Sequence, residues 1–358
     1  MNNYLISLLL TFPFFLGAQG IQESIKTVVQ DHIEHHQFSG TVLVADQGTV
    51  IYQEAFGRTQ LEEGEVITPE SVFGIASITK MLTAIRILQL VETEQLNLED
   101  NLATLLPDLD IPKNRKITVH HLLLHISGLP NESDLIYLQK RNPAEFIQEV
   151  LAQKGKSAGF GKYNYNNVDY VLLGMIIERL TQKSWEDNIE EQFIKPLKLE
   201  NTGFLAKDNY PQGFAYAYQF DQQNQPVQDP DFHIENFYAA GNMYSTAADL
   251  LKIDQAMYGD QLLQEESKAI MFKSYPAYNY TGYSVWTYRY PFVKSQPKIM
   301  ERRGGILGAN VVLIRLLESQ QTIIILSNNN AFNPDSFGDE TNLREALIRL
   351  LAKETPEK

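Results

Sequence analysis

Ser77 and Lys80 lie three positions apart, directly before the apolar, helix-like stretch from Met81 to Val91. Residues three apart share a helix face, so the amine and the hydroxyl can meet. A serine hydroxyl becomes a nucleophile when a base takes its proton, and a lysine can act as that base once burial or nearby cations lower its pKa. The helix amino terminus also favours the negative charge of acyl transfer. The pair indicates acyl-transfer chemistry, although a capping serine and a solvated lysine can have the same spacing.

A second group of polar residues, Tyr163 to Tyr170, precedes an apolar segment that we expect to be helical to about Lys183. The phenol of Tyr165, placed beside a serine–lysine pair, could relay a proton to a leaving group. Asn167 could donate a hydrogen bond to a substrate carbonyl. Asn and Asp at a helix entrance are also ordinary capping residues.

A third candidate is the strand-like segment from Glu301 to Gly308. Gly304 and Gly305 would allow a substrate to lie close to the strand backbone. Strand alternation places Arg302 and Gly304 on one face. The alternative is a hairpin bend flanked by arginines.

The histidines raise the question of a metal site. His32, His35 and His36 end a first amphipathic helix, and His121 and His125 are four residues apart. The glutamate of a zinc-protease helix is missing, so a packed helix end followed by a Ser-Gly turn is the better interpretation of the second pair. We expect neither a metal nor another cofactor; a metal-dependent hydrolase would instead be sensitive to chelators.

Composition restricts the class of protein. The chain has 358 residues, a formal net charge of -14, 44% hydrophobic residues and no cysteine. Length and hydrophobic content are typical of a globular domain with a substantial core. The negative charge argues against nucleic acid as a partner. Without cysteine there is no disulfide, thiolate metal site or cysteine nucleophile.

The amino-terminal segment predicts export. Residues 1–20 contain an apolar run from Tyr4 to Leu16, followed by small residues. This pattern is typical of a signal peptide, and the run is too short to span a bilayer comfortably. No Lys or Arg precedes the run, so an uncleaved anchor is the alternative; we expect no stable membrane span in the mature chain.

The remaining pattern predicts one domain over 21–354. Two strand-like runs, Gly40 to Asp46 and Thr49 to Phe56, form a hairpin around Gln47-Gly48. The part from about 68 to 274 is mainly helical, with a polar loop at 207–236 and a Thr246–Asp249 capping pair. Four more strands and a final helix lie in 275–354. Strands at both ends predict one sheet built from about 21–67 and 275–354 with a helical insertion.

Taken together, residues 38–328 resemble the serine beta-lactamase-related family, which includes class C beta-lactamases, D-alanyl-D-alanine carboxypeptidases and related esterases. The resemblance is carried by the order and spacing of Ser77-Ile78-Thr79-Lys80, His121 to Pro130, Tyr165-Asn166-Asn167, Ala240 to Leu250 and Arg302 to Gly308. It implies an α/β (α+β) sandwich in which an antiparallel sheet packs against helices, with the active site between them.

The resemblance also implies roles for individual residues. Ser77 would be the nucleophile, Lys80 a base, Tyr165 a proton relay and Asn167 a substrate or network contact. The strand with Arg302, Gly304 and Gly305 would line the opposite wall, and the backbone N–H groups of Ser77 and Gly305 would form an oxyanion hole.

Two positions depart from the family pattern. Arg302-Arg303-Gly304 stands where the family usually has Lys or His, a small residue and Gly, and Ala309 stands where an aromatic residue is common. An arginine can grip a carboxylate bidentately but cannot shuttle protons near neutral pH. We therefore expect substrates that carry a carboxylate.

The function expected from the sequence is an exported, periplasmic or secreted serine hydrolase that forms an acyl-enzyme on Ser77. Its substrate would be a small molecule or peptide: a peptidoglycan-like peptide, a beta-lactam or a small ester. An ester or peptide is preferred over a beta-lactam because the Lys-Thr-Gly strand signature is absent. The alternative is a non-catalytic penicillin-binding-like protein that holds or senses a ligand in the same cleft.

Overall fold

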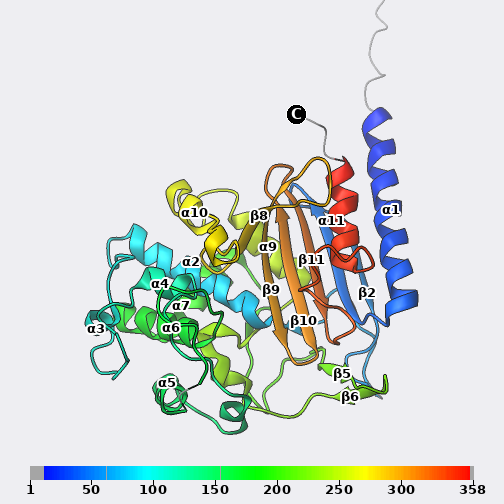
Figure 1. Cartoon of the computed structure of the whole chain (residues 1–358). Helices are drawn as coiled ribbons and strands as arrows, with labels where there is room; N and C mark the ends of the chain where they lie inside the picture. Colours follow the sequence, from blue (N-terminus) through cyan, green and yellow to red (C-terminus); the bar gives the residue numbers. More distant parts are fainter. Residues whose placement is uncertain (1–11, 62, 154, 355–358) are drawn as a thin grey trace, which may run out of the picture.

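The computed structural model describes residues 12–61, 63–153 and 155–354. Its main feature is a six-stranded antiparallel sheet in the order β2-β1-β11-β10-β9-β8 (Figure 1). The strands are β1 (Gly40–Asp46), β2 (Thr49–Phe56), β8 (Trp286–Arg289), β9 (Lys298–Ile306), β10 (Ala309–Leu316) and β11 (Gln321–Ser327). The carboxy-terminal β11 therefore lies between the amino-terminal β1 and β10, and both ends of the chain build one sheet.

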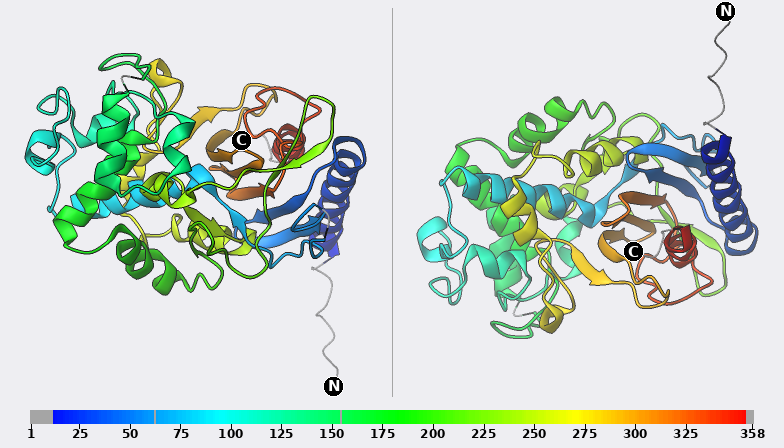
Figure 2. Two further views of the ribbon diagram at one scale, coloured as in Figure 1. Left: turned by 90° about the horizontal axis from the view of Figure 1, so that it is seen from below. Right: turned by 90° about the horizontal axis from the view of Figure 1, so that it is seen from above.

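Helices cover both faces of the sheet. On one face lie α1 (Phe12–His36) and α11 (Leu343–Glu354), seen beside each other at the edge of Figure 2. Ile25 and Val29 of α1 and Leu347 of α11 share a buried cluster with Val42 and Ile325 of the strands. The larger core lies on the other face, between the sheet and the helical region. Because both faces are covered, β11 is buried along its whole length rather than alternating with polar residues.

The helical region follows β2 and returns to the sheet before β8. Its helices are α2 (Thr79–Glu92), α3 (Leu102–Leu105), α4 (Val119–Leu123), α5 (Pro143–Ala152), α6 (Val168–Thr181), α7 (Trp185–Ile189), α8 (Lys195–Leu197), α9 (Ala247–Ala256) and α10 (Glu265–Met271). Short helical turns are η1 (Ala76–Ile78), η2 (Asp134–Leu138), η3 (Glu190–Ile194), η4 (Ile234–Ala240) and η5 (Pro276–Tyr278). Buried residues lie all round α2, which packs against both α6 and η4 at the centre of this region.

The described chain also contains two small sheets. One has the order β3-β7-β4, formed by β3 (Phe73–Gly74), β4 (Gly203–Phe204) and β7 (Met243–Ser245). The other pairs β5 (Tyr218–Phe220) with β6 (Pro226–Gln228). The second sheet lies within 207–236, so that segment is not the continuous loop that the sequence predicts. Its turn is fixed because the Asp221 carboxylate accepts hydrogen bonds from the backbone of Gln223 and Gln225.

The antiparallel sheet with flanking helices and several of the predicted elements are confirmed. The hairpin, the last three strands of the sheet, the final helix and the Thr246–Asp249 cap form as expected. The first helix begins earlier than Ile21, since α1 starts at Phe12. Of the predicted signal peptide, 1–11 lies outside the described residues and 12–20 is part of α1. Within the described chain, no helix combines the length and apolar character needed to cross a bilayer.

A buried ion pair joins the helical region to the sheet. Arg315 of β10 donates to Asp254 of α9 through Nε at 2.7 Å, and the hydroxyl of Thr322 donates to the same carboxylate at 2.7 Å. The side chains of Arg315 and Asp254 are 2% and 0% exposed. Removing one partner of such a pair is costly because the other charge stays buried without compensation.

We expect Asp254→Ala to lower the free energy of unfolding by about 3–5 kcal/mol, because Arg315 would keep its charge and lose its acceptor. Urea unfolding followed by circular dichroism measures this change. The double variant Asp254→Leu, Arg315→Met replaces both charges with apolar groups and should recover much of the loss. A single variant as stable as the unmodified protein would show that the pair does not connect the two parts.

Candidate active site

Ser77 and Lys80 meet at the amino terminus of α2, as their spacing predicts. Ser77 lies in η1, which runs directly into α2, and Lys80 Nζ lies 2.8 Å from Ser77 Oγ. Ala76, just before the serine, has a φ of 46°. A non-glycine residue in this left-handed region is strained, and such strain is found more often at functional sites than elsewhere.

The ammonium group of Lys80 is completely buried and has three acceptors. Besides Ser77 Oγ, these are Asn167 Oδ1 at 2.7 Å and the backbone oxygen of Ala240 at 2.7 Å. Burial lowers the pKa of Lys80 to about 8, since desolvation disfavours the charged form and outweighs the opposing effect of Tyr165. A large fraction of the lysine is therefore neutral in mildly alkaline solution.

The three acceptors also determine what neutral Lys80 can do. A neutral amine has two N–H donors and one lone pair. Asn167 Oδ1 and the Ala240 oxygen can only accept, so they take both donors. The lone pair is left for Ser77, whose hydroxyl can donate as well as accept. This arrangement suits proton abstraction from the serine.

The carbonyl of Ala240 is positioned by an unusual backbone. Tyr238, within η4, has φ 43° and ψ -132°. After this kink, the oxygens of Ala239 and Ala240 both face α2 and accept from Thr83 and Lys80. The sequence gives no sign of this role, since a backbone oxygen is available at every residue type.

Tyr165 lies on the other side of the serine. Its hydroxyl is 2.7 Å from Ser77 Oγ and accepts a hydrogen bond from Arg302 at 2.7 Å. Burial alone would raise the pKa of Tyr165, but the nearby charges of Arg302 and Lys80 lower it to about 8. The phenol is therefore placed to give up or receive a proton near the serine.

Arg302 is engaged by protein groups rather than directed to solvent. Its Nε donates to the backbone oxygen of Ser77 at 2.6 Å, and its two terminal nitrogens donate to Ser284 and Tyr165, each at 2.7 Å. The side chain is 1% exposed. This geometry favours a role in holding Ser77 and Tyr165 over the predicted contact with a substrate carboxylate.

Asn167 connects the lysine to a carboxylate. Its Oδ1 accepts from Lys80, and its Nδ2 donates to Glu132 Oε1 at 2.5 Å. The Tyr137 hydroxyl also donates to Glu132 Oε1, at 3.0 Å. The amide is thereby held in one orientation. Glu132 was not found from the sequence; the only available signal is an acidic residue shortly after the predicted Ser-Gly turn at Ser127-Gly128.

The edge of β9 faces the serine. The pairing of β8 with β9 stops at Glu301, so among the described strands only β10 pairs with Arg302 to Ile306. A side chain at Gly304 would lie 2.6 Å from Ile75 O and 3.1 Å from Ser77 N. The backbone of β9 therefore packs against that of Ser77. The predicted oxyanion hole, formed by the N–H groups of Ser77 and Gly305, fits this close approach.

His125 and Asp169 form a buried layer behind Tyr165. The rings of His125 and Tyr165 are 4.4 Å apart, and Asp169 accepts a hydrogen bond from Ser127 at 2.5 Å. Burial lowers the pKa of His125 well below its usual value and raises that of Asp169. The His121 side chain accepts a hydrogen bond from the backbone N–H of Thr118 at the start of α4. No group of acidic residues and histidines in the described chain is arranged to hold a metal.

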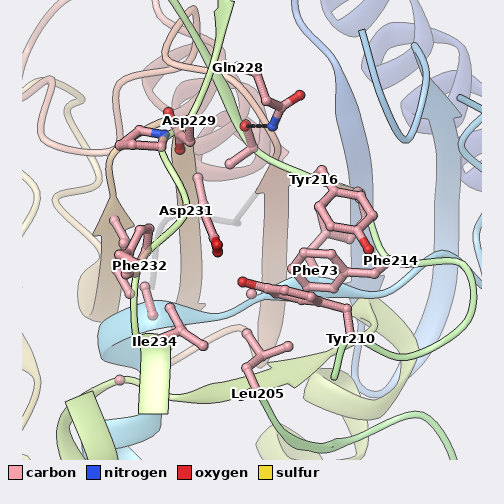
Figure 3. A pocket seen from close by; sticks show the side chains of 18 of the residues that line it. Phe73, Leu205, Tyr210, Phe214, Tyr216, Gln228, Asp229, Asp231, Phe232 and Ile234 are labelled. Carbon is pink, nitrogen blue, oxygen red and sulfur yellow. Dashed lines mark hydrogen bonds between the residues drawn. The ribbon is translucent and has the colours of Figure 1, made fainter. Parts of the chain in front are cut away.

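A cavity of about 390 Å³ is lined in part by Ala76, the residue before Ser77. Figure 3 shows its side chains. Aromatic side chains form much of its wall: Phe73, Tyr210, Phe214, Tyr216 and Phe232. Ala76 and Gly74 bring it next to η1, and Ile306 brings it to the end of β9. A cavity of this size and character can take the apolar part of a small substrate.

A sheet packed against a helical region, with a serine, a lysine and a tyrosine between them, defines the class of serine hydrolases whose nucleophile is paired with lysine. The family model described as Beta-lactamase matches residues 25–348, and the chain belongs to this family. It is 28% identical to a penicillin-binding protein of Bacillus subtilis (strain 168) over 353 residues, covering 92% of this chain and 75% of that protein.

Two further proteins are similar over most of the chain. The teichoic acid D-alanine hydrolase of Staphylococcus aureus (strain MRSA252) is 26% identical over 283 residues, 78% of this chain and 68% of that enzyme. The solved structure of a D-amino acid amidase from Ochrobactrum anthropi SV3, complexed with L-phenylalanine amide, has a TM-score of 0.78 at 23% identity, covering 94% of this chain and 99% of that one. The similarity to the solved structure agrees with the fold, and the similarity to the Staphylococcus aureus enzyme agrees with a hydrolase.

The contact between β9 and the serine predicts the effect of one methyl group. Gly304→Ala should lower kcat by about a hundredfold or more, the cost of losing an oxyanion donor, because the methyl group would push β9 away from Ser77. Gly305→Ala is the matched control: its nearest neighbour would be Asn310 Oδ1 at 3.3 Å, so its loss should be smaller. Ester hydrolysis and melting temperature are measured for both variants. Equal losses of kcat in the two variants would show that the close packing of β9 against Ser77 does not determine the rate.

The two pKa values near 8 predict a bell-shaped dependence of kcat/KM on pH. Lys80 acts as a base only without its proton and Tyr165 gives a proton only while it has one, so kcat/KM for a neutral ester should rise, reach its maximum near pH 8 and fall again. Removing the charge of Arg302 raises the pKa of both Lys80 and Tyr165. In the Arg302→Gln variant, the pH at which kcat/KM is greatest should therefore be higher. This pH reflects Lys80 and Tyr165 together, because the titrations of the two groups are coupled. An unchanged pH of maximum kcat/KM would mean that neither group limits the rate.

Proposed function

We propose that this protein is an exported serine hydrolase that forms an acyl-enzyme on Ser77 and transfers the acyl group to water. The observation that carries the proposal is the position of Lys80. Two acceptor-only oxygens and the serine hydroxyl surround its nitrogen, so its neutral form directs a lone pair at the nucleophile.

In the first step Lys80 takes the proton of Ser77 while Oγ bonds to the substrate carbonyl carbon. The carbonyl oxygen becomes an oxyanion, which the N–H groups of Ser77 and Gly305 receive. As the intermediate collapses, the bond to the leaving group breaks and the leaving group takes a proton through Tyr165. Arg302 keeps the phenol beside the serine.

In the second step water attacks the acyl carbon and gives its proton to the Lys80–Tyr165 pair. The ester bond to Ser77 Oγ then breaks, and the serine regains its proton. Acid and free enzyme are released. In each step the Lys80–Tyr165 pair first takes up a proton and then gives it away, which suits two groups whose pKa values both lie near 8.

The substrate we propose is a small ester or amide, including peptides, rather than a beta-lactam. Relatives named a teichoic acid D-alanine hydrolase and a D-amino acid amidase support this preference. The proposal of export rests on the apolar, small-residue pattern of residues 1–20.

The nucleophile is tested by removing one oxygen. Ser77→Ala should abolish both hydrolysis of p-nitrophenyl esters and labelling by a fluorophosphonate probe, while the melting temperature stays close to that of the unmodified protein. Labelling requires an activated hydroxyl, so a non-catalytic binding protein would not be labelled even with Ser77 present. Turnover retained by the pure variant would contradict the assignment.

The relay is tested separately at Tyr165. Tyr165→Phe keeps the ring and removes the hydroxyl, so kcat should fall by about a hundredfold, within the range for acid–base groups.

The role of Arg302 is tested with a matched pair of substrates. Arg302→Lys cannot make the same three directed hydrogen bonds and should lose activity equally on a carboxylate-bearing substrate and on its methyl ester. A loss confined to the acid would favour the substrate-carboxylate role for Arg302.

A further inference from the structure

We propose that the protein has a second binding site, away from Ser77, that takes a small molecule through a phosphate group. The site is a cavity of about 570 Å³ where the start of β9 and the end of β10 meet α10 and the end of α9. It is named the basic cavity because its lining contains four cationic residues and one acidic residue: Lys268, Lys273, Lys298, Arg315 and Glu265.

The charge of the basic cavity is opposite to that of the whole chain, which has a formal net charge of -14. Lys268 pairs with Glu265 at 3.0 Å and with Asp260 at 3.4 Å, so its charge is offset. Lys273 and Lys298, in contrast, form no ion pair with any residue that the structure describes. Their positive charges therefore remain available to attract an anion.

The neighbours of these two lysines leave their ammonium groups free. Glu318 accepts a hydrogen bond from the backbone N–H of Lys298 at 2.8 Å, but its carboxylate pairs with Arg289 at 2.9 Å. Lys273 Nζ lies 5.0 Å from the centre of the Tyr275 ring, a cation–π contact that does not use its N–H donors. Both lysines can thus donate to a ligand.

Arg315 adds a buried cation with one unused nitrogen. Its Nε and Nη2 donate to Asp254, and its side chain is 2% exposed. Nη1 has no acceptor among the described residues. The guanidinium is held in place over the ring of Tyr258, 4.1 Å from the ring centre. Because Arg315 lines the basic cavity, a ligand oxygen that enters it can form a charge-assisted hydrogen bond with Nη1.

Ser274 supplies a neutral donor in the same wall. Its hydroxyl oxygen is buried and has no hydrogen-bond partner in the protein. A buried hydroxyl without a partner is costly, and a phosphate oxygen would satisfy it. The basic cavity therefore contains a hydroxyl and a guanidinium nitrogen that no described protein group satisfies.

The number and origin of the donors favour a phosphate over a carboxylate. They come from three places: β9 with Lys298, β10 with Arg315 and the segment after α10 with Lys273 and Ser274. A carboxylate offers two oxygens in one plane, whereas a phosphate monoester offers three strong acceptors and up to two negative charges. A flat anionic membrane cannot reach an arginine that is 2% exposed, so the ligand must be a small molecule.

The basic cavity is separate from the catalytic site. None of its lining residues also lines the aromatic cavity next to Ala76. Lys298 begins β9 and Gly304 packs against Ser77, and at the rise of a strand these two residues are ~20 Å apart. The inference therefore does not depend on the hydrolase function.

Calorimetric titration at constant ionic strength tests the site with inorganic phosphate, phenyl phosphate and benzoate. We expect one molecule of either phosphate to bind per chain and benzoate to bind at least tenfold more weakly. The double variant Lys273→Gln, Lys298→Gln should raise Kd for phenyl phosphate by about a hundredfold, since each lysine contributes a hydrogen bond between charged groups. Arg315 is left unchanged because it also pairs with Asp254.

The matched control is the double variant Lys116→Gln, Lys156→Gln. It removes the same charge at two exposed lysines outside the basic cavity and should leave Kd unchanged. Blocking Ser77 with a fluorophosphonate should also leave Kd unchanged. Phosphate should raise the melting temperature of the unmodified protein, as any ligand of the folded state does, and the melting temperature shows that each variant is folded.

Weaker binding in the Lys273–Lys298 variant alone supports the inference. Equal weakening in both double variants would mean unspecific attraction to positive charge and overturns it, as does the absence of binding at millimolar phosphate. Benzoate bound as tightly as phenyl phosphate overturns the phosphate class. Loss of binding after Ser77 is blocked would assign the anion to the catalytic site instead. Each of these results leaves the hydrolase function standing, because that function is tested at Ser77.

Discussion

The site depends on the buried nitrogen of Lys80. A lysine that is 0% exposed is tolerable only if each donor of its charged form has an acceptor, and the fold supplies three oxygens from three separate segments. These segments are η1, the start of α6 and the end of η4. Packing α2 against α6 and η4 therefore assembles the acceptors and lowers the pKa of the lysine at the same time.

Much of this arrangement could be predicted from the sequence because it depends on residue type and spacing. The Ser77–Lys80 interval gives one helix face, and a tyrosine at a helix entrance gives a phenol for the same site. The hairpin around Gln47-Gly48 and the strands after Lys298 follow from alternation and turn residues, and the structure confirms them.

The remaining features depend on tertiary contacts that residue types do not encode. The Ala240 oxygen faces Lys80 because the backbone bends at Tyr238, and a backbone acceptor has no sequence signal. Arg302 lies on the predicted face of β9, but the sequence does not decide which groups its guanidinium contacts. A guanidinium at a cleft can bind a substrate or other groups of the protein. Here Ser77, Tyr165 and Ser284 lie close enough to take its donors.

The position of β11 between β1 and β10 has a consequence for biosynthesis. Ser327, at the end of β11, donates to the backbone oxygen of Ser39, 288 residues earlier, and β1 has β11 as its neighbour toward the centre of the sheet. Contacts this distant in sequence form late, because a long loop must close first. While a ribosome is still making the chain, the hairpin can fold but the sheet beside the serine cannot be completed. The nascent chain should therefore have no hydrolytic activity until almost all of it has been synthesised.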